Sequence, residues 1–182
     1  MVIACSKSVA SVVLETVQGW DCVGFSGSRI LVADSLRVAR WAATQLADVR
    51  GFVGCASGAD AVFRAGCSGL EVLEADRSLG KGGFAQRSIS MVRHVANGGG
   101  GLVSFPDKPC PSSLVPHELS SRAFCGSGSG SWATLSYAIG LGLPCLVWLP
   151  PQIAAPSGWG LRPLGRGWYC APRKQVRLPL SL

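Results

Sequence analysis

One short segment near the N-terminus, GFSGSR, combines residue types that can bind an anion. Gly24 and Gly27 allow a tight turn and a close approach of the backbone to a ligand. Ser26 and Ser28 add hydroxyl groups, and Arg29 adds a cation that can hold an oxyanion through two hydrogen bonds. The segment is therefore a candidate phosphate-binding loop, although a plain turn uses the same residue types.

The pattern on either side predicts a strand-to-helix turn. Residues 21–25 are a strand-like run, and residues 30–46 carry apolar side chains at helical spacing, beginning with Ile30. The first amides of a helix have no partner within the helix and attract anions. A phosphate is therefore expected where the predicted helix begins.

Strands and helices alternate through the first 149 residues. A short helix is expected at 8–18, strands at 21–25, 51–55, 70–75, 102–105 and 144–149, and further helices at 30–46, 59–65, 84–96 and 132–141. This alternation predicts an α/β fold with a doubly wound, mainly parallel, five-stranded sheet and helices on both faces. Ligands bind such sheets at the carboxyl ends of the strands, where the glycine-rich loops are expected.

Two further loops at this edge carry candidate ligand contacts. In GCASGAD, Ser57 and Gly58 suit a helix start, and Asp60 lies in the first turn as either a capping residue or a ligand contact. The loop after the third strand brings Lys81 and Arg87 to the same rim. A cation in the first helical turn opposes the helix dipole, so Arg87 indicates a nearby anion or a side chain that leans into solvent.

The fourth loop, GSGSGSWAT, opens directly into a predicted helix. Its candidate ligand contacts are Gly128, Ser129, Gly130 and Ser131. A flexible linker has a similar composition. Its position before a helix favours a second anion-binding turn.

Charge is distributed unevenly along the chain. All ten acids lie at or before Glu118, whereas six of the 17 Lys and Arg residues follow it. This asymmetry predicts an anionic partner such as nucleic acid, and a solvated basic tail is the alternative. The divisions expected are an N-terminal segment at 1–20, a domain at 21–149 and a proline-rich basic tail at 150–182.

The tail is expected to be irregular and to pack on the domain, a second subunit or a ligand. It alternates aromatic residues with cations, and its candidate nucleic-acid contacts are Trp159, Arg162, Arg166, Trp168, Tyr169, Arg173, Lys174 and Arg177. Stacking rings among cations are typical of proteins that bind single strands. A homo-oligomer is also expected.

Several classes of protein are not expected. No apolar run reaches the roughly 18 residues of a membrane span, and the N-terminus lacks the form of a signal peptide, so a cytoplasmic protein without a membrane partner is predicted. The eight cysteines are widely spread without a CxxC pair, so neither a disulfide framework nor a metal site is indicated.

Taken in order, the loops resemble those of the SLOG superfamily. The matching features are GFSGSR, GCASGAD, an AD followed by GK and a helix with Arg87 and Met91, a strand ending in FP, and GSGSGSW. The superfamily includes the DNA-processing protein A (DprA) family, the Lonely Guy (LOG) phosphoribohydrolases and YspA-like proteins. The resemblance covers about residues 21–149 and implies a Rossmann-like fold that binds nucleotides or nucleic acid at these loops.

One departure from the LOG pattern bears on catalysis. Thr134 stands where the PGGxGTxxE motif has its Glu, and no acid follows Glu118. Cleavage of an N-glycosidic bond needs a carboxylate, so a hydrolase is expected only if Asp60, Asp76 or Glu118 has taken over that role. No catalytic residue and no cofactor is predicted.

Two functions therefore stay open. The first is a DprA-like protein that binds the backbone of single-stranded DNA or RNA at the loops and the tail. The second is a non-catalytic sensor or carrier of a small nucleotide. A LOG-type phosphoribohydrolase is a third possibility that the missing Glu disfavours.

Overall fold

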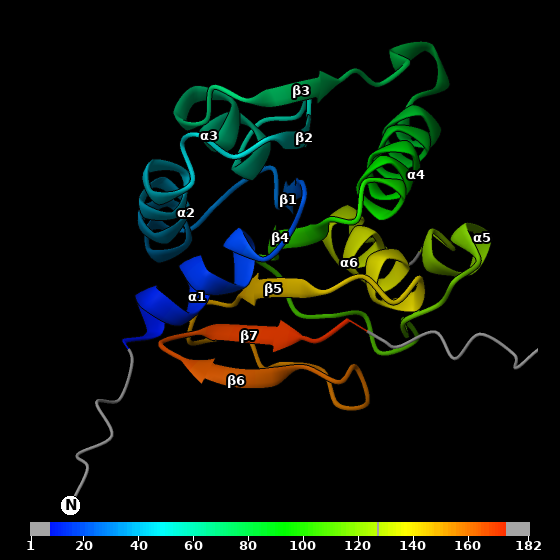
Figure 1. Ribbon diagram of the computed structural model, residues 1–182. Coiled ribbons are helices and arrows are strands. Elements are labelled where there is room, and N and C mark those ends of the chain that lie inside the picture. Colours follow the sequence, from blue (N-terminus) through cyan, green and yellow to red (C-terminus); the bar gives the residue numbers. More distant parts are fainter. Residues whose placement is uncertain (1–7, 127, 174–182) are drawn as a thin grey trace, which may run out of the picture.

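A single mixed sheet forms the centre of the computed structural model, which describes residues 8–126 and 128–173 (Figure 1). Its seven strands are ordered β3-β2-β1-β4-β5-β7-β6. Their bounds are β1 Val23–Gly27, β2 Gly51–Gly54, β3 Leu70–Leu73, β4 Gly101–Phe105, β5 Cys145–Trp148, β6 Arg162–Gly165 and β7 Trp168–Ala171. Strands β1 to β5 are parallel, whereas β7 runs antiparallel to β5 and β6 antiparallel to β7. The prediction of an α/β fold is confirmed.

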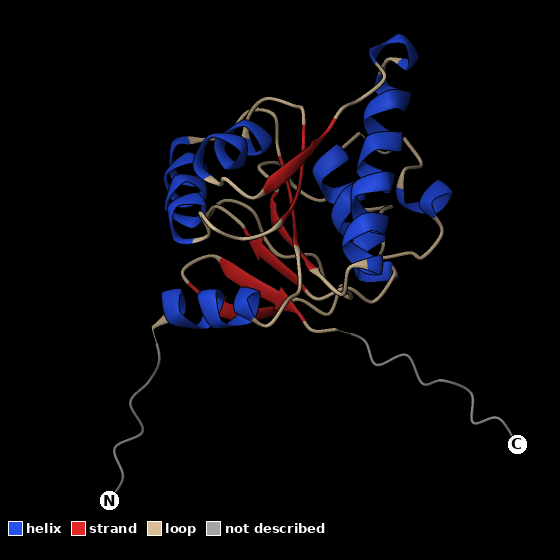
Figure 2. Ribbon diagram, turned by 45° about the horizontal axis from the view of Figure 1, so that its top comes forward, coloured by secondary structure: helices blue, strands red, loops and turns tan. Residues whose placement is uncertain are grey.

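Helices cover both faces of the sheet. Their bounds are α1 Val9–Gln18, α2 Ala33–Gln45, α3 Ala59–Gly66, the short 3-10 helix η1 Arg77–Leu79, α4 Lys81–Asn97, α5 Ser120–Ala123 and α6 Gly130–Gly140. Figure 2 shows α2 and α3 on one side of the strands and α4, α5 and α6 on the other. Within the described residues, no helix combines the length and the apolar character needed to cross a membrane.

An apolar cluster fills each face of the sheet. On the side of α3, the Phe25 and Phe63 rings stack with centroids 4.1 Å apart. On the side of α4 and α6, Met91 and Trp132 are fully buried. Strands such as β4, which is buried along its whole length, therefore have nearly continuous apolar sequences.

The five-stranded sheet followed by an irregular tail is a wrong prediction. Residues 162–171 form the β6–β7 hairpin, which extends the sheet beyond β5 (Figure 1). Trp168 is buried and its ring contacts that of Phe105, with centroids 5.6 Å apart. The pattern was hidden because β6 is an edge strand, where the exposed Arg162 and Pro163 are tolerated.

Two helices begin at positions other than those predicted. α2 begins at Ala33, and Ile30 lies outside it with 84% of its surface exposed. α4 begins at Lys81, so most of the GKGG run lies inside the helix. Gly83 is required there because an added Cβ would lie 1.8 Å from the Asp76 carbonyl oxygen.

Candidate functional site

The loops after β1, β2 and β4 are joined by hydrogen bonds at the carboxyl ends of the parallel strands. The Ala59 amide donates to the Ser28 carbonyl oxygen at 3.1 Å, and the Ser57 hydroxyl donates to the Arg29 carbonyl oxygen at 3.1 Å. The Asp107 amide donates to the Ser28 hydroxyl oxygen at 2.8 Å. These loops, two of which carry predicted site residues, therefore meet at one edge of the sheet.

Part of GFSGSR lies within β1 and serves packing. Gly24, Ser26 and Gly27 lie in β1, and Ser26 is buried. An added Cβ at Gly24 would lie 2.8 Å from the Val95 side chain, and one at Gly27 would lie 2.4 Å from that of Ala59. The two glycines therefore let α4 and α3 approach the sheet.

A pocket of about 220 Å³ lies at the end of β2. We call it the edge pocket, and its described lining residues are Arg29, Cys55, Ala56, Ser57, Arg77 and Phe84. The Arg29 guanidinium carbon lies 4.2 Å from the centre of the Phe84 ring, a cation–π contact that restrains the side chain. Two guanidinium groups and a hydroxyl therefore surround the pocket, and none of these six residues is an acid.

Gly58 turns the chain into α3 beside this pocket. It has a φ of +70°, and an added Cβ would lie 2.1 Å from the Ser28 carbonyl oxygen. Both the left-handed backbone and the lack of space require a glycine there. Gly58 is also the residue that caps α3, so Asp60 is not the cap.

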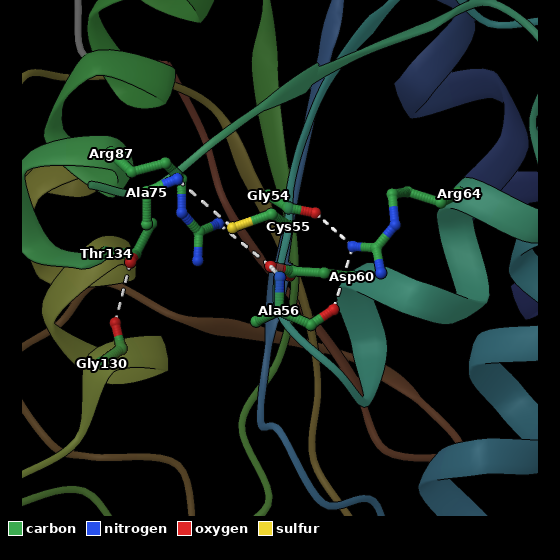
Figure 3. Close-up of polar contacts among 9 residues, drawn as sticks. All are labelled: Gly54, Cys55, Ala56, Asp60, Arg64, Ala75, Arg87, Gly130 and Thr134. Carbon is green, nitrogen blue, oxygen red and sulfur yellow. Dashed lines mark hydrogen bonds and ion pairs between the residues drawn. The ribbon is translucent and has the colours of Figure 1, made fainter. Parts of the chain in front are cut away.

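Arg87 forms a buried ion pair with Asp60. Its Nη1 lies 3.0 Å from Asp60 Oδ2, and the two side chains are 8% and 5% exposed. Figure 3 shows Arg87 directed toward the β2–α3 loop from the opposite side to Arg64. The chain thus supplies the anion that the sequence position of Arg87 predicts, and Arg87 does not lean into solvent.

Competing influences act on the Asp60 carboxyl group. Burial raises its pKa above the ordinary carboxyl value, although Arg87, the Ala56 amide and Arg64 each act to lower it. The backbone of Gly54 passes so close that an added Cβ would lie 1.3 Å from Arg87 Nη1. The missing side chain at Gly54 therefore leaves the space that the ion pair occupies.

The start of α2, where the sequence predicts a bound anion, holds the Asp107 carboxylate. Its Oδ2 accepts the Val32 amide at 2.5 Å, and its Oδ1 accepts the Ser35 hydroxyl at 2.6 Å. A carboxylate is favoured at this position because the first amides of a helix carry a partial positive charge. The chain's own acid thus occupies the expected phosphate position.

The loop before α6 is open at its glycines. An added Cβ at Gly128 or Gly130 would meet no atom within 4 Å, while Ser131 is buried. The Thr134 hydroxyl donates to the Gly130 carbonyl oxygen at 2.8 Å, so this hydroxyl closes a bond within α6 (Figure 3). Lys81 is exposed at the first position of α4 and is not among the residues that line the edge pocket.

The aromatic residues predicted to stack bases are largely in the core. Trp159 and Trp168 are 3% and 4% exposed, and the Trp159 ring packs against that of Trp132 with centroids 5.4 Å apart. Tyr169 is half-buried on β7. Neither Trp159 nor Trp168 therefore offers a free face for stacking.

The register of the hairpin separates its cations. Arg166 lies in the turn beside Trp168, which pairs with Trp148 at the carboxyl end of β5. Arg173 lies toward the other end of the sheet, where its Nη2 donates to the Gly99 carbonyl oxygen at 2.6 Å. The remaining exposed cation, Arg162, lies on edge strand β6. The predicted contacts Lys174 and Arg177 lie outside the described residues.

Sequence reasoning missed four residues of this region, namely Arg64, Arg77, Phe84 and Asp107. Arg64 follows Asp60 by four residues in α3, a spacing that places the two side chains on one helix face. Asp107 stands two residues after β4, where a polar side chain at a strand end was an available signal. Nothing in the sequence distinguishes Arg77 or Phe84 from ordinary surface residues.

The fold and the edge pocket define an α/β protein with a mixed sheet and a cationic pocket at the carboxyl ends of its parallel strands. The comparisons with family models, curated proteins and solved structures yielded no match to this chain. Any function must therefore be argued from the site itself.

Proposed function

We propose that this protein binds a small, phosphate-bearing ligand of the nucleotide type in the edge pocket and does not convert it chemically. The observation that carries this proposal is the pair of guanidinium groups, Arg29 and Arg77, around a pocket whose six described lining residues include no acid. Arginine suits phosphate because its planar group can donate two parallel hydrogen bonds to the oxygens.

The restraint on Arg29 supports a binding role. Its guanidinium lies against the Phe84 ring, and its carbonyl oxygen accepts the Ser57 hydroxyl. A side chain already held in place loses less conformational entropy when a ligand arrives. The Phe84 ring also gives the pocket an apolar surface beside its charged groups.

The side chains at Thr134 and Asp60 support binding without hydrolysis. Thr134 provides no carboxylate, and the Asp60 carboxylate is buried against Arg87. A catalytic acid or base must come within hydrogen-bonding distance of the reacting group. With its side chain only 5% exposed, Asp60 is poorly placed to reach a ligand in solvent.

The likeness to the SLOG superfamily and the DprA-like role in binding single strands stay predictions. A phosphate group of a single strand could bind to the same two arginines as the phosphate group of a small ligand. The burial of Trp159 and Trp168, and the separation of Arg166 from Arg173, favour the small ligand, because they weaken the case for a stacking track along the tail.

Isothermal titration calorimetry with AMP, cyclic AMP, ADP-ribose, adenosine and a single-stranded oligonucleotide tests the proposal. We expect at least one of the phosphate-bearing compounds to bind, and adenosine to bind much more weakly than AMP. Arg29→Gln and Arg77→Gln should each weaken binding by about tenfold or more, because a hydrogen bond to a charged group contributes about 1.5–3 kcal/mol.

Arg162→Gln on the exposed edge strand is the matched control and should leave the affinity unchanged. Equal affinity for AMP and adenosine would contradict the proposal. Binding of the oligonucleotide alone, weakening steeply with added salt, would favour the nucleic-acid function instead.

A further inference from the structure

The end of β2 and the loop that follows it, residues 54–57, are held by side chains of α3. Arg64 Nη1 donates to the carbonyl oxygens of Gly54 and Ala56, the latter at 2.9 Å. Asp60 Oδ2 accepts the Ala56 amide at 3.3 Å. Side chains of α3 therefore fix the carbonyl groups of Gly54 and Ala56 (Figure 3). The next residue along the chain, Ser57, lines the edge pocket.

The geometry of the peptide between Ala56 and Ser57 fixes the direction of the Ser57 N–H group. In a trans peptide the C=O and N–H groups point in opposite directions, and none of the described peptide bonds is cis. Because the Ala56 carbonyl points to Arg64, the N–H of Ser57 in the same peptide points away from Arg64. The Ser57 hydroxyl donates to the Arg29 carbonyl oxygen, and this hydrogen bond holds Ser57 beside the edge pocket.

We propose that Arg64 is a positioning residue of the edge pocket. It orients the peptide between Ala56 and Ser57 so that the Ser57 amide donates to a ligand phosphate alongside Arg29 and Arg77. Arg64 itself is not among the lining residues and acts only through the loop. This inference rests on the proposed function, and it adds a backbone donor to the two arginines.

The guanidinium group of arginine suits the positioning role of Arg64. Its guanidinium carries five donors in a rigid plane, so a single Arg64 nitrogen can be placed between the Gly54 and Ala56 oxygens. A lysine has a compact ammonium group on a flexible stem and holds such an arrangement less firmly. The Arg64→Lys variant should therefore retain part of the effect, and Arg64→Met should retain none.

The test is a titration with inorganic phosphate followed by ¹H–¹⁵N NMR in the wild type, Arg64→Met and Arg64→Lys. In the wild type, the Ser57 amide signal should move and saturate together with the side-chain Nε signals of Arg29 and Arg77. In Arg64→Met, the affinity should fall about tenfold and the Ser57 amide should no longer move, while the Arg29 and Arg77 signals still respond.

Arg37→Met, which removes an arginine with a 77% exposed side chain on α2, is the matched control and should bind as the wild type does. A wild-type titration in which Arg29 and Arg77 respond but the Ser57 amide does not would overturn the role of Arg64 and leave the proposed function standing. The same holds if Arg64→Met keeps the full Ser57 response. If none of these groups responds to phosphate or AMP, both the role of Arg64 and the proposed function are overturned. The wild-type titration can be interpreted even if Arg64→Met fails to fold.

Discussion

Gly54 shows how one missing side chain creates space for a buried charge pair. An added Cβ would lie 1.3 Å from Arg87 Nη1 and 2.4 Å from Asp60 Oδ2. Separating a buried pair leaves charges without compensation, which is far more costly than losing an exposed ion pair. The sequence shows only a glycine at a strand end, so this role becomes visible only when α3 and α4 are placed.

Gly54→Ala is expected to lower the free energy of unfolding by about 3–5 kcal/mol, because the new methyl group forces Arg87 and Asp60 apart. Urea denaturation followed by circular dichroism measures the change. Gly82→Ala in α4 is the matched control, because the nearest atom to its added Cβ would be 4.0 Å away. This variant should be as stable as the wild type or more stable by about 0.5 kcal/mol. Equal stability of the two variants would contradict the role assigned to Gly54.

The Asp76 carboxylate gives a pH dependence with a definite sign. The Ser78 hydroxyl and then the Ser78 amide lower its pKa by donating to the ionised form. This contribution to stability is therefore present above the ordinary carboxyl pKa and is lost as pH falls through the lowered value. Ser78→Ala should raise the pKa of Asp76 toward its ordinary value in a ¹³C NMR titration, and an unchanged pKa would show that the hydroxyl bond contributes nothing.

The β6–β7 hairpin changes how the C-terminal third is understood. Its prolines, glycines and arginines predict a tail, yet Trp168 on β7 packs between the rings of Trp41 and Phe105, with centroids 6.4 Å and 5.6 Å away. In an edge strand such as β6, apolar and polar residues do not alternate clearly, because most of the side chains face solvent. Edge strands of this kind are thus difficult to predict from local pattern.

Trp168→Ala should cost about 3–5 kcal/mol of unfolding free energy, as expected for removing a large buried ring from a packed core. Arg162→Ala on the neighbouring strand should change it by less than about 0.5 kcal/mol, because that side chain is exposed. Urea denaturation of both variants provides the comparison. A small effect at Trp168 would mean that the hairpin does not pack as a part of the sheet in solution.

The five parallel strands were predictable because short, mainly apolar runs alternate with helical patterns along the sequence. Loops after three of them meet where the sequence places a candidate site. The partners of Asp107 and Asp60 were not predictable, because each carboxylate pairs with residues distant in the sequence. Long-range pairing of this kind depends on the order of strands in the sheet.

At the scale of the whole molecule, the sheet order decides which predicted site residues can act together. It brings the predicted residues Arg29 and Ser57 to the edge pocket, together with Arg77, which was not predicted. It places Asp107 at the start of α2. It also places Arg166 and Arg173 toward opposite ends of β7. Among the described residues, Arg166 and Arg173 are therefore too far apart along β7 to act at one point.

A ligand phosphate is expected to bind at the end of β2 and not at the start of α2. A ¹H–¹⁵N NMR titration with AMP tests it most directly, since each backbone amide reports its own surroundings. We expect the largest saturable shifts at Arg29, Ser57 and Arg77. Largest shifts at Ala33 to Ser35 or in the β6–β7 hairpin, or no saturable shift at all, would contradict it.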